Sequence, residues 1–173
     1  MQDEFPDIEF MLGREIFFGE DIAELLQENV VSTLNDTDYA LIEFHPTATA
    51  DYIAQSLYKV ENAGYTPVLA HIERYPDLFK NIKMIEQIIE GGAYIQVNAS
   101  SVEGRLGGGV KRQIIKLMKK GLVHFVATDA HSNRSRAPQL EECIRYIEKK
   151  LGSDYVKKLF IDNPEKMVHN EYI

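Results

Sequence analysis

Five side chains that could bind a divalent metal ion lie near the ends of apolar segments: Glu15, Glu43, His71, Asp129 and His131. Glu15 and Glu43 are 28 positions apart, and Glu43 and His71 are again 28 positions apart. Carboxylates mixed with imidazole suit a borderline ion such as Mn²⁺, Zn²⁺ or Fe²⁺. Paired ions roughly 3.5–4 Å apart are a common device for hydrolysing phosphate esters. These residues therefore predict metal-assisted hydrolysis, provided that the fold gathers them.

Each of these residues, taken singly, also has a simpler structural explanation. A glutamate such as Glu15 is usually a solvated loop charge, and a histidine such as His71 is more often a hydrogen-bonded core residue than a ligand. Asp129 and His131 could be a helix cap followed by a surface histidine. Glu43 is stronger, because it lies inside the apolar run YALIEFH, where an unpaired carboxylate is costly. The regular spacing of the set favours the metal site.

Two arginines could hold a phosphate beside such a site. Arg74 lies three positions after His71, and Arg136 lies five positions after His131. A guanidinium grips a phosphoryl group bidentately and stabilises charge on it. The alternative for each arginine is an ordinary surface ion pair.

Two other phosphate chemistries are disfavoured. A cysteine-dependent phosphatase needs a thiolate in a phosphate-binding loop. The single cysteine, Cys143, instead lies in the amphipathic helical pattern QLEECIRYIEKKLG. The glycine-rich EGRLGGGVKRQ matches no P-loop spacing. Phosphatase chemistry in this chain would therefore depend on metal-activated water.

The bulk composition fits one globular domain. The chain has 173 residues, of which 45% are hydrophobic, and its formal net charge is −8. The chain is acidic and lacks the basic stripe that is typical of a nucleic-acid-binding protein. No apolar run approaches the ~20 residues that cross a bilayer, and the N-terminus does not resemble a signal peptide. A single cysteine fits a reducing compartment, so we expect a cytoplasmic protein with neither nucleic-acid binding nor membrane insertion.

Short apolar runs that alternate with amphipathic segments would position the candidate residues. Five runs rich in Val, Ile, Tyr and Phe predict strands buried on both faces; they are IEFMLGREIFF, YALIEFH, PVLAHIERY, AYIQVNASS and VHFVATDAH. Such an alternation predicts an α/β fold with a parallel sheet. In these folds function gathers where the strands end.

Helical periodicity fills the segments between the runs. It predicts three sets of inward-facing residues, namely Ile53, Leu57 and Val60; Ile82, Ile85 and Ile89; and Ile114, Leu117 and Met118. Near the end, DNPEKMV predicts a helix with Asn163 as its N-cap and Pro164 as its first residue. His124 lies early in its strand, so we expect it to be structural.

Longer blocks resemble a known family. GREIFF, YALIEFH, PVLAHIERY, YIQVNASSVEGRLG, GLVHFVATDAHS and LFIDNPEKMV are similar to successive blocks of the bacterial manganese-dependent tyrosine phosphatases. These belong to the PHP (polymerase and histidinol phosphatase) superfamily and accompany capsular and extracellular polysaccharide synthesis. The resemblance runs from about Met11 to Ile173. It implies a distorted (β/α)7 TIM-like barrel as a single domain over residues 1–173, and hydrolysis of phosphotyrosine on the tail of a partner tyrosine kinase.

The resemblance also implies roles around a cluster of up to three ions, Mn²⁺ with Fe or Zn as alternatives. Glu15 would bridge two ions, and Glu43 and His71 would complete one of those sites. Asp129 would bind a second ion and His131 a third. The two arginines identified above would hold the substrate phosphate while activated water attacks phosphorus.

The chain departs from the family pattern at its N-terminus. The family begins with a strand carrying His-x-His and further ligands, and these are absent here. We therefore expect an incomplete barrel that lacks its first one or two βα units. We also expect fewer ions than in the family, at most one of them well occupied, and weak or absent phosphatase activity. The first remaining strand would be an open edge, which predicts self-association or a rearranged N-terminus.

Two alternative functions remain. The first is a small-molecule PHP phosphatase that acts on a histidinol-phosphate-like substrate. The second is a non-catalytic remnant that binds a phosphotyrosine peptide without releasing phosphate.

Overall fold

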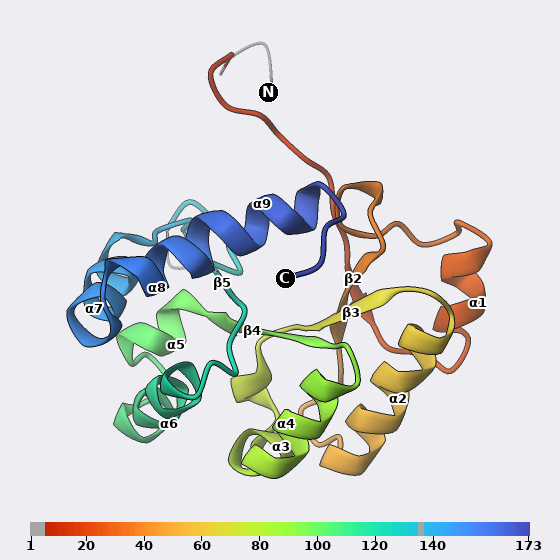
Figure 1. The fold of residues 1–173 in the computed structure, drawn as a ribbon, viewed down its shortest axis with the longest axis horizontal. Coiled ribbons are helices and arrows are strands. Elements are labelled where there is room, and N and C mark those ends of the chain that lie inside the picture. The colour runs from red at the N-terminus through yellow and green to blue at the C-terminus, as the bar shows by residue number, and fades with distance from the viewer. Residues whose placement is uncertain (1–5, 135–136) are drawn as a thin grey trace.

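A parallel sheet of five strands is the centre of the fold (Figure 1). The computed structural model describes residues 6–134 and 137–173. In this part of the chain the strands are β1 (Glu15–Phe17), β2 (Tyr39–Glu43), β3 (Thr66–Leu69), β4 (Tyr94–Asn98) and β5 (Phe125–Ala127). Their spatial order is their order in the sequence, and every neighbouring pair is parallel. The predicted α/β class and parallel sheet are confirmed, whereas closure into a barrel stays a prediction.

Helices connect the strands and follow them along the chain. The described helices are α1 (Ile22–Gln27), α2 (Ala50–Asn62), α3 (Pro76–Lys80), α4 (Ile82–Glu90), α5 (Ala99–Glu103), α6 (Gly108–Lys119), α7 (Glu141–Leu151), α8 (Ser153–Lys157) and α9 (Asn163–Val168). Two short 3₁₀ turns, η1 (Leu34–Asp36) and η2 (Ile72–Arg74), and a π-helical turn, η3 (Lys158–Asp162), complete the order. None of the helices in the described ranges is long and apolar enough to cross a membrane.

The two faces of the sheet are covered differently. Helices α2, α4 and α6 lie on one side in Figure 1, where the large hydrophobic core forms, and α9 crosses the other side. That second face carries a smaller cluster of Tyr39, Val68 and Phe125, packed against Met167 of α9 and Ile173. The sheet is therefore buried on both faces, which explains the nearly continuous apolar strands.

The inward faces of two helices are those that the periodicity predicts. In α2 and α6, all six residues predicted to face inward are buried. In α4 the buried residues are Ile85 and Ile88, whereas Ile82 and Ile89 are only partly buried. The apolar stripe of α4 is wide enough to allow either choice, and packing against the sheet and α2 selects Ile88.

The helix predicted at DNPEKMV is confirmed as α9, but the assignment of Asn163 as its N-cap is wrong. The helical backbone continues from α8 through η3 into α9, and Asp162 itself has helical dihedral angles of −64° and −46°. Asn163 is buried, and its Nδ2 donates to the backbone oxygen of His124 at 2.7 Å. The amide therefore holds the helix against the start of β5 instead of capping a new one.

His124 is a structural residue, as expected. Its side chain is buried, and its Nδ1 accepts the N–H of Ile95 at 3.1 Å. The edge of its ring meets Tyr94, with centroids 4.9 Å apart. Burial lowers the pKa of His124 to about 4, and the charge of Lys158 acts in the same direction.

This depressed pKa predicts a specific loss of stability in acid. The stabilisation is fully present above the unfolded-state pKa of roughly 6.5 and is lost as the pH falls towards about 4. Between pH 7 and pH 5, the unaltered chain should lose roughly 2 kcal/mol more unfolding free energy than His124→Asn. The Oδ1 of this asparagine can still accept the Ile95 N–H. Urea unfolding at both pH values measures the difference.

The control for this prediction is His169→Asn, because His169 is exposed. The control should lose as much stability on acidification as the unaltered chain. Equal acid sensitivity in all three proteins would contradict the assignment to His124.

Candidate metal centre

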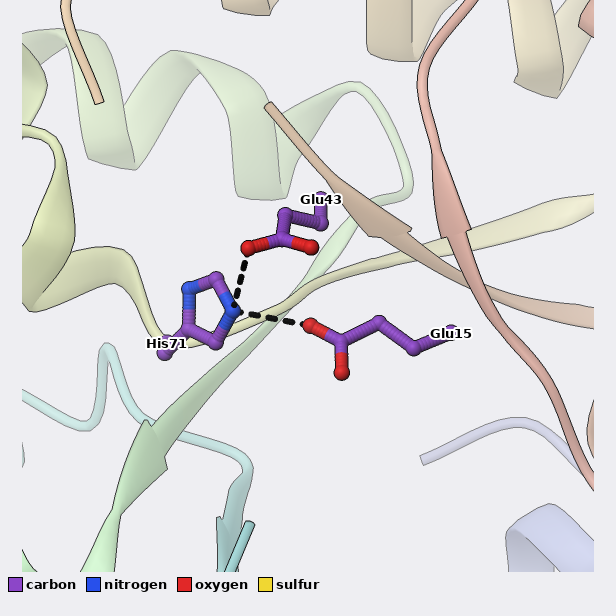
Figure 2. Close-up of side chains that lie close together, drawn as sticks. All are labelled: Glu15, Glu43 and His71. Carbon is purple, nitrogen blue, oxygen red and sulfur yellow. Dashed lines mark hydrogen bonds and ion pairs between the residues drawn. The ribbon is translucent and has the colours of Figure 1, made fainter. Parts of the chain in front are cut away.

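Glu15, Glu43 and His71 meet at one point, although they come from three different segments (Figure 2). The Nε2 atom of His71 lies 2.8 Å from Oε1 of Glu15 and 3.3 Å from Oε1 of Glu43. One possible ligand atom from each residue lies within 4.8 Å of the others. Two carboxylates and one imidazole form a donor set that suits a borderline divalent ion. The structure therefore brings three of the five predicted ligands together.

The strands place these three side chains in different ways. Glu43 is the last residue of β2, and His71 follows β3, as the sequence indicated. Glu15, however, is the first residue of β1, so the interpretation that it follows its strand is wrong. It pairs in register with Leu41, two positions before Glu43. Only its long side chain lets Glu15 reach the histidine.

The backbone of His71 has an unusual conformation that aims its ring at the carboxylates. Its φ of +32° and ψ of +60° lie near the left-handed region, which is costly for a residue other than glycine. Its N–H donates to Oε1 of Gln96, and its carbonyl accepts the N–H of Arg74 at 2.9 Å. These bonds hold the strained residue in place at the end of β3.

Arg74 lies beside this group and makes two ionic contacts. Its guanidinium is 2.6 Å from Oδ2 of Asp129 and 3.6 Å from Oε1 of Glu43. The side chain is 36% exposed, so it is also open to a ligand. The structure thus places one predicted phosphate-binding arginine next to the candidate ligands.

Asp129 and His131 do not join the same group within the described residues. The carboxylate of Asp129 accepts hydrogen bonds from Arg74 and from Nδ2 of Asn98, the latter at 2.9 Å. His131 is exposed, and its Nδ1 lies 2.9 Å from the backbone oxygen of Asp129. Their roles as ligands stay predictions. Arg136 lies outside the described residues.

A chain of amides lies behind the site; Asn98 was recognised from the sequence as a polar strand end, but Gln96 and the bonds between the amides were not. Gln96 receives the N–H of His71 and donates from Nε2 to Oδ1 of Asn98 at 2.9 Å. Asn98 in turn donates to Asp129. The available signal was Gln96 itself, because a polar residue inside the apolar run AYIQVN requires partners once it is buried.

Two residues of the AHIERY block were also missed. Glu73 is buried, and its Oε1 accepts the N–H of Asn98 at 2.9 Å, which ties η2 to the end of β4. Burial raises the pKa of Glu73 above its ordinary value, although hydrogen bonds from Ser101 and Asn98 oppose the shift. Tyr75 is fully buried, and burial likewise raises the pKa of its hydroxyl. That hydroxyl lies 3.4 Å from Nδ1 of His71.

Two cavities border the candidate site. The first, of about 290 Å³, has Glu15, His71 and Asp129 at its polar side and is lined elsewhere mainly by apolar side chains of the sheet and α9. The second, of about 170 Å³, is lined by Arg74, Arg105 and neighbouring polar groups. A ligand with an anionic group therefore has access to arginine beside the carboxylate–histidine cluster.

Cys143 does not provide an alternative nucleophile. It lies in α7 with no exposed surface. Burial raises the pKa of its thiol to about 12. A reactive cysteine requires the opposite conditions, an accessible thiol with a depressed pKa.

Comparison with known proteins places this geometry in a family. A family model described as "Capsular polysaccharide synthesis, CpsB/CapC" matches residues 1–169. The tyrosine-protein phosphatase CpsB of Streptococcus pneumoniae is 37% identical over 172 residues, which cover 96% of this chain and 71% of the relative. The tyrosine-protein phosphatase YwqE of Bacillus subtilis is 32% identical and is covered over 63% of its length.

A solved structure agrees with these matches. It is described as one of the crystal structures of YwqE and of CpsB, "unique metal-dependent tyrosine phosphatases". Its TM-score is 0.89 at 31% identity, and the match covers 99% of this chain and 69% of the other. The relatives are thus metal-dependent tyrosine phosphatases of capsule synthesis. This chain belongs to the CpsB/CapC family of capsular polysaccharide synthesis.

Proposed function

We propose that this chain is a metal-dependent protein-tyrosine phosphatase whose substrate is the phosphotyrosine tail of a bacterial tyrosine kinase. The observation that carries the proposal is the meeting of Glu15, Glu43 and His71, in a family whose members are named tyrosine-protein phosphatases. We propose Mn²⁺ as the preferred ion, with Fe²⁺ or Zn²⁺ as alternatives, since all three suit this donor set.

Each candidate residue has a role in this proposal. Glu15, Glu43 and His71 would hold one ion, while Asp129 and His131 would contribute to a second and a third. A bound divalent ion would supply Lewis acidity and lower the pKa of a coordinated water. Arg74 and Arg136, the two arginines predicted from the sequence, would bind the substrate phosphate.

Arg74 would act mainly by charge and orientation. It lies between Glu43 and Asp129, so these carboxylates hold its guanidinium beside the proposed ion. From there it can bind two phosphoryl oxygens and stabilise the negative charge that grows on them in the transition state. Fixing the ester in one orientation also lowers the entropic part of the activation free energy of hydrolysis.

We further propose that residues 1–173 form one domain and that its sheet corresponds to part of a seven-stranded, TIM-like barrel. The strands pair in parallel and in sequence order, which supports this, because such a barrel consists of consecutive strand–helix units whose strands pair in the same way. The match leaves about a third of the related structure without a counterpart here. Among the described residues one group of possible ligands comes together, Glu15 with Glu43 and His71, so we expect at most one well-occupied site and weak turnover.

The edge strand β1 supports the proposal of self-association. Among the described strands it pairs only with β2, and Phe17 on it is 60% exposed. An open edge with an exposed aromatic residue favours pairing with another chain. Analytical ultracentrifugation should therefore show a dimer or larger species whose population falls in Phe17→Lys. A monomer at all concentrations would contradict this.

The experiment that tests the function is phosphate release from a phosphotyrosine peptide with a tyrosine-rich sequence. We expect release with Mn²⁺ and none with EDTA. Faster release from histidinol phosphate would favour the small-molecule alternative. Peptide binding without release in any of the three ions would favour the non-catalytic alternative.

A further inference from the structure

The Tyr75 hydroxyl touches two of the three candidate ligand segments. Its oxygen accepts the N–H of Phe44, the residue directly after Glu43, at 3.0 Å. The same oxygen lies 3.4 Å from Nδ1 of His71, on the opposite side of the imidazole from the carboxylates. One buried atom thus joins the end of β2 to the histidine after β3.

The surroundings leave this hydroxyl little freedom. Tyr75 has no exposed surface, and its ring meets Phe44 edge-on with centroids 6.1 Å apart. Its ring lies 5.9 Å from the His71 ring, centroid to centroid. Since both aromatic neighbours are packed in place, the hydroxyl cannot swing away from Nδ1 without disturbing the core.

The chemistry of imidazole makes a hydroxyl the useful partner at Nδ1. When Nε2 carries the ring proton, this N–H can donate a hydrogen bond to Glu15, and Nδ1 is then an acceptor that needs a donor. When the Nε2 lone pair binds an ion, Nδ1 carries the proton and needs an acceptor. The N–H of Phe44 occupies one lone pair of the Tyr75 oxygen. The other lone pair and the hydroxyl proton can serve both states, which a carboxylate or a carbonyl could not do.

We propose that Tyr75 is a positioning residue that holds His71 for metal binding, its hydroxyl partnering Nδ1 both with and without the ion. This inference rests on the proposed metal-dependent function and adds a residue to that site. Tyr75 does not touch the ion. It fixes the ring orientation of one ligand and, through the Phe44 N–H, the strand end that carries another.

A purely structural role for the hydroxyl makes different predictions. If its only task were to satisfy the Phe44 N–H, Tyr75→Phe would lower stability and leave metal affinity unchanged. Tyr39→Phe is a matched control, because Tyr39 is also buried and its hydroxyl donates to the backbone oxygen of Glu171 at 2.6 Å, outside the candidate site.

The test is calorimetric titration of each substrate-free protein with Mn²⁺. Tyr75→Phe should bind Mn²⁺ about tenfold to hundredfold more weakly, as loss of an outer-shell partner does elsewhere. Tyr39→Phe should bind within about twofold of the unaltered chain. The ring ¹⁵N signals of His71 in the metal-free proteins should shift in Tyr75→Phe and stay in place in Tyr39→Phe.

Three results separate the possible failures. Unchanged Mn²⁺ affinity in Tyr75→Phe would overturn the positioning role while leaving the proposed function intact. Failure of Tyr75→Phe alone to fold would also overturn it, by showing that the hydroxyl is needed for the core. Absence of Mn²⁺ binding in the unaltered chain would instead overturn the metal-dependent function on which the inference rests.

Discussion

Replacing His71 with alanine should remove most of the thermal stabilisation that Mn²⁺ gives to the unaltered chain. His71 supplies the only nitrogen ligand of the described three-residue group, and its Nε2 lies within 3.3 Å of both carboxylates. At an ion concentration of about 100 Kd, binding should stabilise the folded chain by about 2.7 kcal/mol. A roughly hundredfold loss of affinity would reduce this to about 0.4 kcal/mol.

The measurement is the melting temperature with Mn²⁺ and with EDTA. For a chain of this size the stabilisation corresponds to roughly 5–10 °C in the unaltered protein and about 1 °C in His71→Ala. Each variant serves as its own reference, because removing a buried histidine also lowers metal-free stability. His45→Ala, at an exposed position outside the group, should keep the full shift. An undiminished shift in His71→Ala would exclude the histidine as a ligand.

Removing the charge of Arg74 should reduce turnover without weakening the metal site. Arg74→Met loses both contacts to the phosphoryl oxygens in the proposed mechanism, so kcat/KM for a phosphotyrosine peptide should fall by about 100- to 1,000-fold. The guanidinium lies 3.6 Å from Glu43. Loss of this competing cation should leave Mn²⁺ affinity equal to or higher than that of the unaltered chain.

Two further variants test whether the loss of activity is specific to the guanidinium of Arg74. Arg74→Lys keeps the charge but not the planar fork, so its activity should lie between the other two. Arg145→Met removes an exposed arginine that pairs with Glu141 on α7, and it should leave activity unchanged. Parallel losses of turnover and of Mn²⁺ affinity in Arg74→Met would show instead that Arg74 maintains the structure of the site.

The sequence was sufficient for the positions of β2 to β5 and for the residues of the central cluster. Each strand of a parallel sheet is a short apolar run, and a polar residue at its end is conspicuous, which is why Glu43 and His71 could be identified. Glu15 was identified by spacing, although the bounds of its strand were placed too early. Register with β2, a property of two segments together, decides where β1 begins.

The supporting network could not be predicted in the same way. The contact between Tyr75 and His71 depends on the left-handed backbone of His71, a conformation that the residue type does not predict. The bond from His71 to Gln96 crosses between strands and appears only once the sheet is assembled. Likewise, the continuous helix through Asn163 follows from the long-range bond to His124, which outweighs the local capping pattern.

The burial of Cys143 has a consequence for how such an enzyme would behave under oxidative stress. Hydrogen peroxide attacks accessible thiolates and converts them first to sulfenic acid. The only sulfhydryl of this chain is shielded inside α7 and holds its proton firmly. A phosphatase whose site consists of oxygen and nitrogen ligands would therefore stay active at peroxide concentrations that inactivate cysteine-dependent phosphatases.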